Sequence, residues 1–238
     1  MSDILLVHGS CHGAWCWCQL TPELDALGHT PRSIDMPSHG ADLTPITEVT
    51  LDSCAQSVVD ALGSDTVVVA HSWAGFPVTQ AADMAPKQIA RVIYLCAYFP
   101  WNGYSLADMR RKAPRQPLAP AIVHSLDGYS FGIDPAMINE VFYHDCPPEA
   151  VELARARLGQ QAISPQETPI QLGDTFKKVA KSYIRCTDDR TIPPEFQVTM
   201  TDGWPAENLH EMPTGHSPFF ADPKGLAALI DKIIRVCR

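Results

Sequence analysis

The sequence predicts an α/β protein with a mostly parallel sheet flanked by helices, and with a helical cap inserted after the strand at about residues 89–99. Apolar runs of strand length alternate with segments of helical periodicity. The runs are continuously apolar, which is typical of strands buried on both faces of a parallel sheet. This alternation breaks after about residue 100 and returns near residue 176, which indicates an insertion.

The order of the elements supports an open sheet. Strands are expected at residues 4–9, 30–36, 65–71, 89–99, 179–187 and 208–213. Helices are expected at residues 15–27, 49–63, 73–84, 147–159 and 222–236. Strand–helix–strand units of this spacing form right-handed crossovers, so helices should cover both faces of the sheet.

The chain is expected to divide into a core and a cap. Residues 1–99 and 176–238 carry the regular strands and helices, whereas residues 100–175 are rich in proline and hold one clear helix, at 147–159. Open α/β sheets bind ligands at the carboxyl ends of their strands. We therefore expect residues 100–175 to cover that edge.

Composition limits the classes of partner. The chain has 238 residues, of which 45% are hydrophobic, enough for one sizeable domain. A net charge of −9 argues against nucleic acid or an anionic membrane as a partner. The start has no basic segment before a long apolar run, and no window approaches 18 apolar residues. We expect a soluble cytoplasmic protein, and a homodimer remains open.

Eight cysteines are scattered along the chain. Without a secretory signal or a small size, they do not indicate a disulfide framework. The segment from Cys11 to Cys18 lies beside His8 and His12, but it has no C-x-x-C pair or second ligand pair at zinc-finger spacing. We expect neither a metal site nor a cofactor.

The segment VVVAHSWAGFPV, residues 67–78, places Ser72 between a strand and a helix. A nucleophile elbow has this order and is usually written G-x-S-x-G, because strand and helix approach closely around the strained serine. Here Ala70 and Ala74 replace both glycines. Alanine is small enough for the turn, but a buried hydroxyl that caps a helix is the simpler interpretation of a lone motif. A catalytic serine also needs partners.

Those partners occur in the required chain order. A serine nucleophile needs a histidine base, and the base needs a carboxylate that fixes its tautomer. The strand at 179–187 leads into Asp188 and Asp189, and the strand at 208–213 leads into a loop with His216. Three such residues at the ends of separate strands predict a triad of Ser72, His216 and one of the two aspartates, which spacing alone does not distinguish.

An acyl-transfer triad also requires donors for the oxyanion. One should be the N–H of Trp73, the residue after the nucleophile, and the other should come from the loop after the first strand. Gly9 lets that loop turn tightly, so the N–H of Ser10 is the expected second donor. The Trp73 side chain is expected to line the substrate pocket.

Several motifs resemble one known group of proteins. LLVHGSCHGAWCW, VVVAHSWAGFPV, YIRCTDDRTIPPEFQ and the later GHSPFF are similar to the α/β-hydrolase subfamily of plant methyl-ester esterases and α-hydroxynitrile lyases, with their bacterial relatives. The resemblance covers nearly the whole chain and implies the α/β-hydrolase fold. It also implies that Asp189 is the acid, by its place in C-T-x-D-x-x-I-P, and that the amides of Ser10 and Trp73 bind the oxyanion.

The subfamily performs two chemistries with one triad. The lyases have a threonine after the first-strand histidine and a lysine after the triad histidine, and that lysine holds the departing cyanide. Here these positions are Gly9 and Ser217, which we expect near the substrate pocket. Without the cation, the resemblance favours a serine esterase that cleaves a small carboxylic ester. A C–C lyase and a non-catalytic small-molecule receptor are the alternatives.

Overall fold

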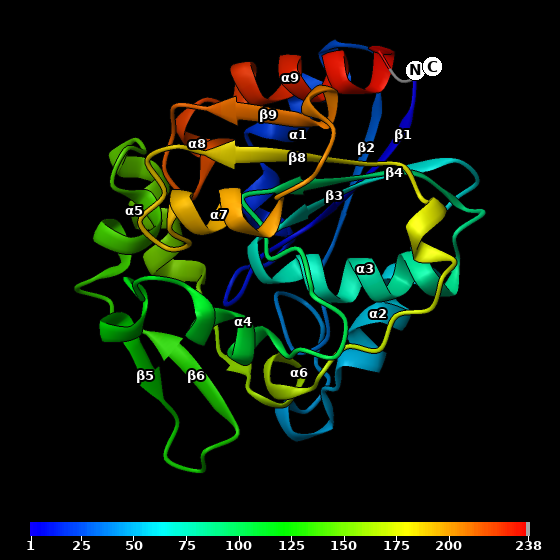
Figure 1. Cartoon of the computed structure of the whole chain (residues 1–238). Helices are drawn as coiled ribbons and strands as arrows, with labels where there is room; N and C mark the ends of the chain where they lie inside the picture. The colour runs from blue at the N-terminus through cyan, green and yellow to red at the C-terminus, as the bar shows by residue number, and fades with distance from the viewer. Residues whose placement is uncertain (237–238) are drawn as a thin grey trace.

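The computed structural model describes residues 1–236, so Cys237 lies outside the described residues. A six-stranded sheet forms the centre, in the order β2-β1-β3-β4-β8-β9 (Figure 1). All five neighbouring pairs are parallel, as the sequence predicted. The strands are β1 Asp3–Val7, β2 Thr30–Ile34, β3 Thr66–His71, β4 Ile89–Leu95, β8 Lys181–Cys186 and β9 Leu209–Met212.

The central strands contribute side chains to two cores, one on each face of the sheet. Leu5 of β1 and Val68 of β3 belong to one buried cluster, and their neighbours Leu6 and Val69 belong to the other. Successive residues of a strand point to opposite faces, so a strand between two helical layers must be apolar along its whole length. This is why the continuous apolar runs were reliable signals.

Helices cover both faces of the sheet. The first cluster includes side chains from α2 Leu51–Asp60, α3 Gly75–Met84 and α7 Pro194–Met200. The second includes side chains from α1 Leu20–Ala26, α8 Pro218–Ala221 and α9 Pro223–Val236. In Figure 1, α9 lies above the sheet, and α2 and α3 lie below it. The predicted α/β fold is therefore confirmed.

The insertion between β4 and β8 is drawn mainly in green in Figure 1. It contains α4 Leu106–Lys112, α5 Pro148–Arg157 and α6 Ser164–Glu167. It also contains a three-stranded antiparallel sheet of β5 Ile122–His124, β6 Ser130–Ile133 and β7 Gln161–Ala162, which the sequence analysis did not predict. The division into a core of residues 1–99 and 176–238 and a cap of residues 100–175 stays a prediction.

Several predicted boundaries were wrong by two or three residues, and two elements differ more. The strand expected at residues 89–99 ends at Leu95, because the next residue, Cys96, has a φ of 34° that a strand does not accept. The helix expected at residues 15–27 is a 3₁₀ turn, Ala14–Trp17, followed by α1 from Leu20. Within residues 1–236, no helix has the length and apolar character needed to cross a membrane.

The sheet core should be sensitive to cavities. We expect Leu6→Ala to lower the free energy of unfolding by about 2–5 kcal/mol, because the Leu6 side chain is fully buried. Leu43→Ala is the control, since Leu43 is 91% exposed and its loss should change stability by less than about 0.5 kcal/mol. Urea denaturation of both variants measures the difference, and equal losses would contradict the assigned core.

Candidate active site

Ser72 occupies a strained turn where β3 meets the helix that follows it. Its φ is 58°, in the left-handed region, and it begins a 3₁₀ turn, Ser72–Ala74, that continues into α3. A non-glycine residue in this conformation costs about 1–3 kcal/mol unless its surroundings hold it. The N–H of Tyr98 donates to the Ser72 carbonyl at 3.0 Å and contributes to that hold.

At the turn, the backbone of the segment after β4 comes very close to Gly75. A Cβ placed on Gly75 would lie 1.9 Å from the carbonyl oxygen of Tyr98, which no side chain can tolerate. Ala70 and Ala74 are fully buried, but their methyl groups are accommodated. The two alanines are therefore compatible with a nucleophile elbow. The position that requires glycine is Gly75, one residue after the end of the G-x-S-x-G motif.

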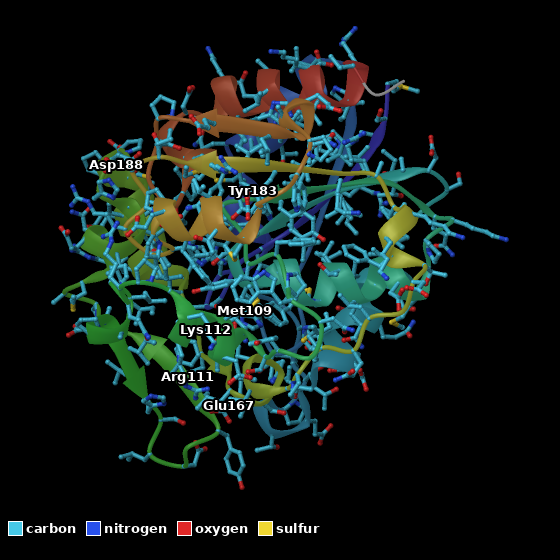
Figure 2. All side chains as sticks on the ribbon, in the orientation of Figure 1. Met109, Arg111, Lys112, Glu167, Tyr183 and Asp188 are labelled. Carbon is cyan, nitrogen blue, oxygen red and sulfur yellow. The ribbon has the colours of Figure 1, made fainter. Side chains whose placement is uncertain are left out.

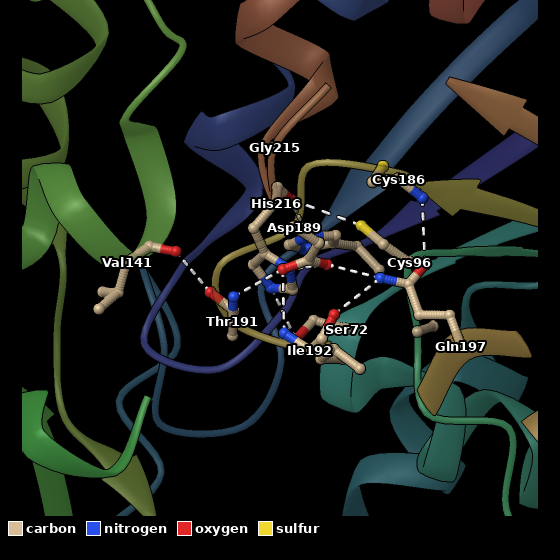
Figure 3. A network of polar contacts seen from close by, with 12 residues as sticks. Ser72, Cys96, Val141, Cys186, Asp189, Thr191, Ile192, Gln197, Gly215 and His216 are labelled. Atoms are coloured by element: carbon tan, nitrogen blue, oxygen red, sulfur yellow. Dashed lines mark hydrogen bonds and ion pairs between the residues drawn. The ribbon is translucent and has the colours of Figure 1, made fainter. Parts of the chain in front are cut away.

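His216 connects the serine to a carboxylate (Figure 3). Its Nε2 lies 3.0 Å from Ser72 Oγ, and its Nδ1 lies 2.9 Å from Asp189 Oδ2. With Nδ1–H donating to the carboxylate, Nε2 is free to accept the serine proton. All three side chains are buried, so solvent does not weaken these contacts.

Asp189 is held by donors on both carboxylate oxygens. Oδ1 accepts from the backbone N–H groups of Thr191 and Ile192, at 2.7 and 2.9 Å. Oδ2 accepts from Gln197 Nε2 at 2.9 Å in addition to its contact with the histidine ring. These bonds fix the carboxylate and compensate for the cost of burying its charge.

Asp188 takes a different place. Its side chain is 63% exposed and contacts His144 Nε2 at 3.0 Å. That hydrogen bond holds the pKa of Asp188 below its ordinary value. Spacing in the sequence left the two aspartates equivalent, whereas the structure brings Asp189, and not Asp188, to His216.

Two further histidines lie beside His216 and are neutral. Burial lowers the pKa of His71 well below its ordinary value and lowers that of His12 to about 3. Neutral His71 can donate from Nε2 to the carbonyl of His216, at 2.8 Å. His12 lies 2.7 Å from the Ser10 carbonyl through Nδ1, and it thereby supports the loop after β1.

Ser10 and Trp73 both line the cavity that contains Ser72. Trp73 is in the first turn of a helix, where N–H groups have no acceptor within the helix. Neither its N–H nor that of Ser10 donates to a loop or side-chain acceptor within residues 1–236. The Ser10 hydroxyl instead accepts from Gln166 Nε2 at 2.8 Å, which ties the loop to the insertion.

The cavity above Ser72 is small and mostly apolar. Its volume of about 20 Å³ is enough for roughly one water molecule. Residues of the insertion form much of its wall, and the sequence analysis missed them because no motif marks them: Leu106, Arg110, Leu118, Phe131, Phe142 and Gln166. Entry of a substrate therefore requires some of these side chains to move.

Gly9 and Ser217, which we expected near the pocket, do not line this cavity. Gly9 packs against a neighbouring ring, because a Cβ there would lie 2.7 Å from His71 Nδ1. Ser217 is fully buried behind the triad histidine, and its hydroxyl has no partner in the described chain. Trp73 does line the cavity.

One cluster has the side-chain types of a metal site. Within residues 1–236, ligand atoms of His71, Cys96 and His216 lie within 4.8 Å of one another. Both ring nitrogens of His216 already contact Ser72 and Asp189, and burial raises the pKa of Cys96 well above its ordinary value. The cluster thus offers a protonated thiol and an occupied imidazole, which is a poor ligand set.

The fold and the triad geometry agree with the family comparison. The model of the alpha/beta hydrolase family matches residues 4–229, and the chain belongs to this family. Its relatives include Methylesterase 1 of Arabidopsis thaliana, 30% identical, with 96% of this chain and 94% of that protein covered. Methylesterase 7 of the same plant is 28% identical, with 96% and 95% covered.

Solved structures show the same fold. The methylesterase protein MES16 from Arabidopsis has a TM-score of 0.84 at 25% identity, with 99% of this chain and all of that chain covered. A pyrethroid hydrolase from Sphingobium faniae JZ-2 has a TM-score of 0.87 at 23% identity, with 98% and 97% covered. The chain is therefore a member of the alpha/beta hydrolase family related to plant methylesterases.

A substitution at Gly75 tests how closely the Tyr98 carbonyl approaches the turn. We expect Gly75→Ala to lower the free energy of unfolding by at least about 3 kcal/mol, because the new methyl group meets a backbone carbonyl that cannot move alone. Ala74→Gly, one residue earlier, should cost no more than about 1 kcal/mol. Thermal or urea denaturation measures both, and a tolerated Gly75→Ala would contradict this geometry.

Proposed function

We propose that the protein is a serine hydrolase that cleaves a small carboxylic ester by acyl transfer. The observation that carries this proposal is the buried, hydrogen-bonded series from Ser72 through His216 to Asp189. The relatives named methylesterase, similar along nearly the whole chain, support an ester as the substrate.

The reaction would proceed through an acyl-enzyme. His216 takes the proton from Ser72 Oγ through Nε2 as that oxygen attacks the ester carbonyl. The N–H groups of Ser10 and Trp73 stabilise the oxyanion that forms. The alcohol then leaves with the proton from His216, and a water molecule hydrolyses the acyl-enzyme by the same route.

Asp189 would act through His216. Its carboxylate accepts from Nδ1–H, which keeps the lone pair of Nε2 directed at Ser72. When the imidazole takes a proton, the adjacent negative charge stabilises the imidazolium. The proposed steps need only side chains, backbone amides and water, so no cofactor is invoked.

The lyase alternative is disfavoured at both diagnostic positions. Position 217 carries serine, so no cation is available there to stabilise a departing cyanide. At position 9, a threonine side chain would begin 2.7 Å from His71 Nδ1 and 2.9 Å from Ser72 Cβ, so the elbow would have to shift.

The alternative of a non-catalytic receptor is distinguished by turnover. A receptor would bind a small-molecule ligand but would not hydrolyse an ester over multiple rounds.

Removal of the nucleophile tests the proposal. We expect the wild-type protein to hydrolyse p-nitrophenyl butyrate with multiple turnovers, and Ser72→Ala to lose several orders of magnitude in rate. The residual rate should not exceed the roughly 10³- to 10⁴-fold acceleration over water that an intact oxyanion site can retain. Initial rates of the two folded proteins decide the matter, and comparable rates would reject Ser72 as the nucleophile.

The two adjacent aspartates form a matched pair. We expect Asp189→Asn to lower kcat by about 10⁴-fold, because an amide in place of the carboxylate favours the wrong tautomer of His216. Asp188→Asn should change kcat by less than about tenfold, since its side chain contacts His144 at the surface. Kinetics at neutral pH compare them, and equal effects would reassign the acid.

A further inference from the structure

Arg110 places a positive charge at the cavity, and this charge has no part in the proposed steps of Ser72, His216 and Asp189. Of the described side chains that line the cavity, Arg110 is the one with a permanent charge, and none is a carboxylate. The neutral His12 and His71 contribute no charge of their own. The wall around the reacting atoms therefore carries one fixed positive charge in mainly apolar surroundings.

The helix α4 directs Arg110 toward the cavity. Leu106 and Arg110 are four residues apart, so they lie on one face of the helix, and both line the cavity. The neighbouring Arg111 does not line it and pairs with Asp108 at 2.9 Å on the exposed side. Figure 2 labels Met109, Arg111 and Lys112 along the same helix.

Arg110 has no neutralising partner in the part of the chain that the structure describes. Among residues 1–236 its guanidinium makes no hydrogen bond or ion pair, whereas Arg115, in the same insertion, pairs with Glu195 at 2.7 Å. The hydroxyl of Tyr98, which also lines the cavity, has no hydrogen bond either within these residues. Burial raises the pKa of Tyr98 above its ordinary value, although the charge of Arg110 opposes this, so the phenol stays a donor.

We infer that the substrate is an ester that also carries an ionised carboxylate, and that Arg110 binds this carboxylate with Tyr98 as a second donor. A guanidinium presents its N–H groups in a planar fork that fits a carboxylate with two parallel hydrogen bonds. Arg110 is half-buried and has no hydrogen bond or ion pair among residues 1–236, so its guanidinium is free to pair with a carboxylate that enters the cavity. This inference rests on the proposed esterase function and makes Arg110 a specificity-determining residue.

Matched ester pairs test the inference. The monomethyl and dimethyl esters of succinate, glutarate and adipate form three pairs, in which the acyl part carries either a carboxylate or a neutral ester at increasing distance from the scissile ester. In a fourth pair, 4-acetoxybutyrate and its methyl ester, the carboxylate or neutral group is on the alcohol part. For the best pair, we expect Arg110→Gln to lower the ratio of kcat/KM for the acid over the neutral ester by about 10- to 100-fold. Arg110→Lys should restore only part of it, because an ammonium lacks the fork.

Arg111→Gln is the control, because it removes a charge from the same helix but not from the cavity. It should leave every ratio within about twofold of wild type. If Arg110→Gln changes no ratio while the esters are hydrolysed, the inference is wrong and the esterase function stands. Arg111→Gln lowering the ratios as much as Arg110→Gln would also overturn it, because the effect would then be general electrostatics.

A binding measurement separates this inference from the esterase proposal. Isothermal titration calorimetry measures the Kd of glutarate for two proteins, the Ser72→Ala variant and the double variant Ser72→Ala/Arg110→Gln. We expect the Kd of the double variant to be about 10- to 100-fold higher. If no ester is hydrolysed by the wild-type protein, the esterase function fails, and this pair still decides whether Arg110 binds a carboxylate. Equal affinities in the two variants, or no binding to either, would reject the carboxylate site.

Discussion

The left-handed backbone of Ser72 is the constraint on which the site depends. This conformation places Oγ beyond the end of β3, within 3.0 Å of His216 Nε2. It persists because the segment after β4 lies directly against the turn: the N–H of Tyr98 holds the Ser72 carbonyl, and the Tyr98 carbonyl leaves room only for glycine at position 75. The pairing of β3 with β4 in the sheet core thus sets the position of Ser72, the proposed nucleophile.

The insertion contributes to the loops of the triad as well as to the cavity wall. The Val141 carbonyl accepts from the Thr191 hydroxyl at 2.6 Å, beside the acid (Figure 3). The N–H of Gly215 donates to Asp145 at 2.6 Å, beside the histidine. The ring of Phe142 stacks near the triad imidazole, with centroids 5.6 Å apart. One short segment therefore couples the insertion to both loops, so movements that admit substrate must preserve these contacts or re-form them.

Sequence patterns predicted what depends on periodicity and chain order. The buried strands were visible as apolar runs. Ser72 was visible because it follows such a run, and His216 because its place after the last predicted strand fits the chain order of a triad. Spacing could not separate Asp188 from Asp189, since both occupy one turn; the family motif implied Asp189, and the structure brings that residue to the histidine. The two- to four-residue strands of the small sheet are too short for periodicity to detect. Nor could any motif place Arg110, whose role depends on how α4 packs over the sheet edge.

Among the neighbouring histidines His8, His12, His71 and His216, the described residues pair His216 with a carboxylate, that of Asp189. Burial lowers the pKa of His8, His12 and His71, so at neutral pH they act as neutral connectors. A second imidazolium beside His216 would compete for the single negative charge of Asp189 and weaken the base. The net charge of −9 disfavours an approaching anion at long range, but about 0.1 M salt screens charges more than roughly 10 Å away. Within the cavity the charge of Arg110 is the nearer one, so the anionic ester inferred above would be attracted at close range.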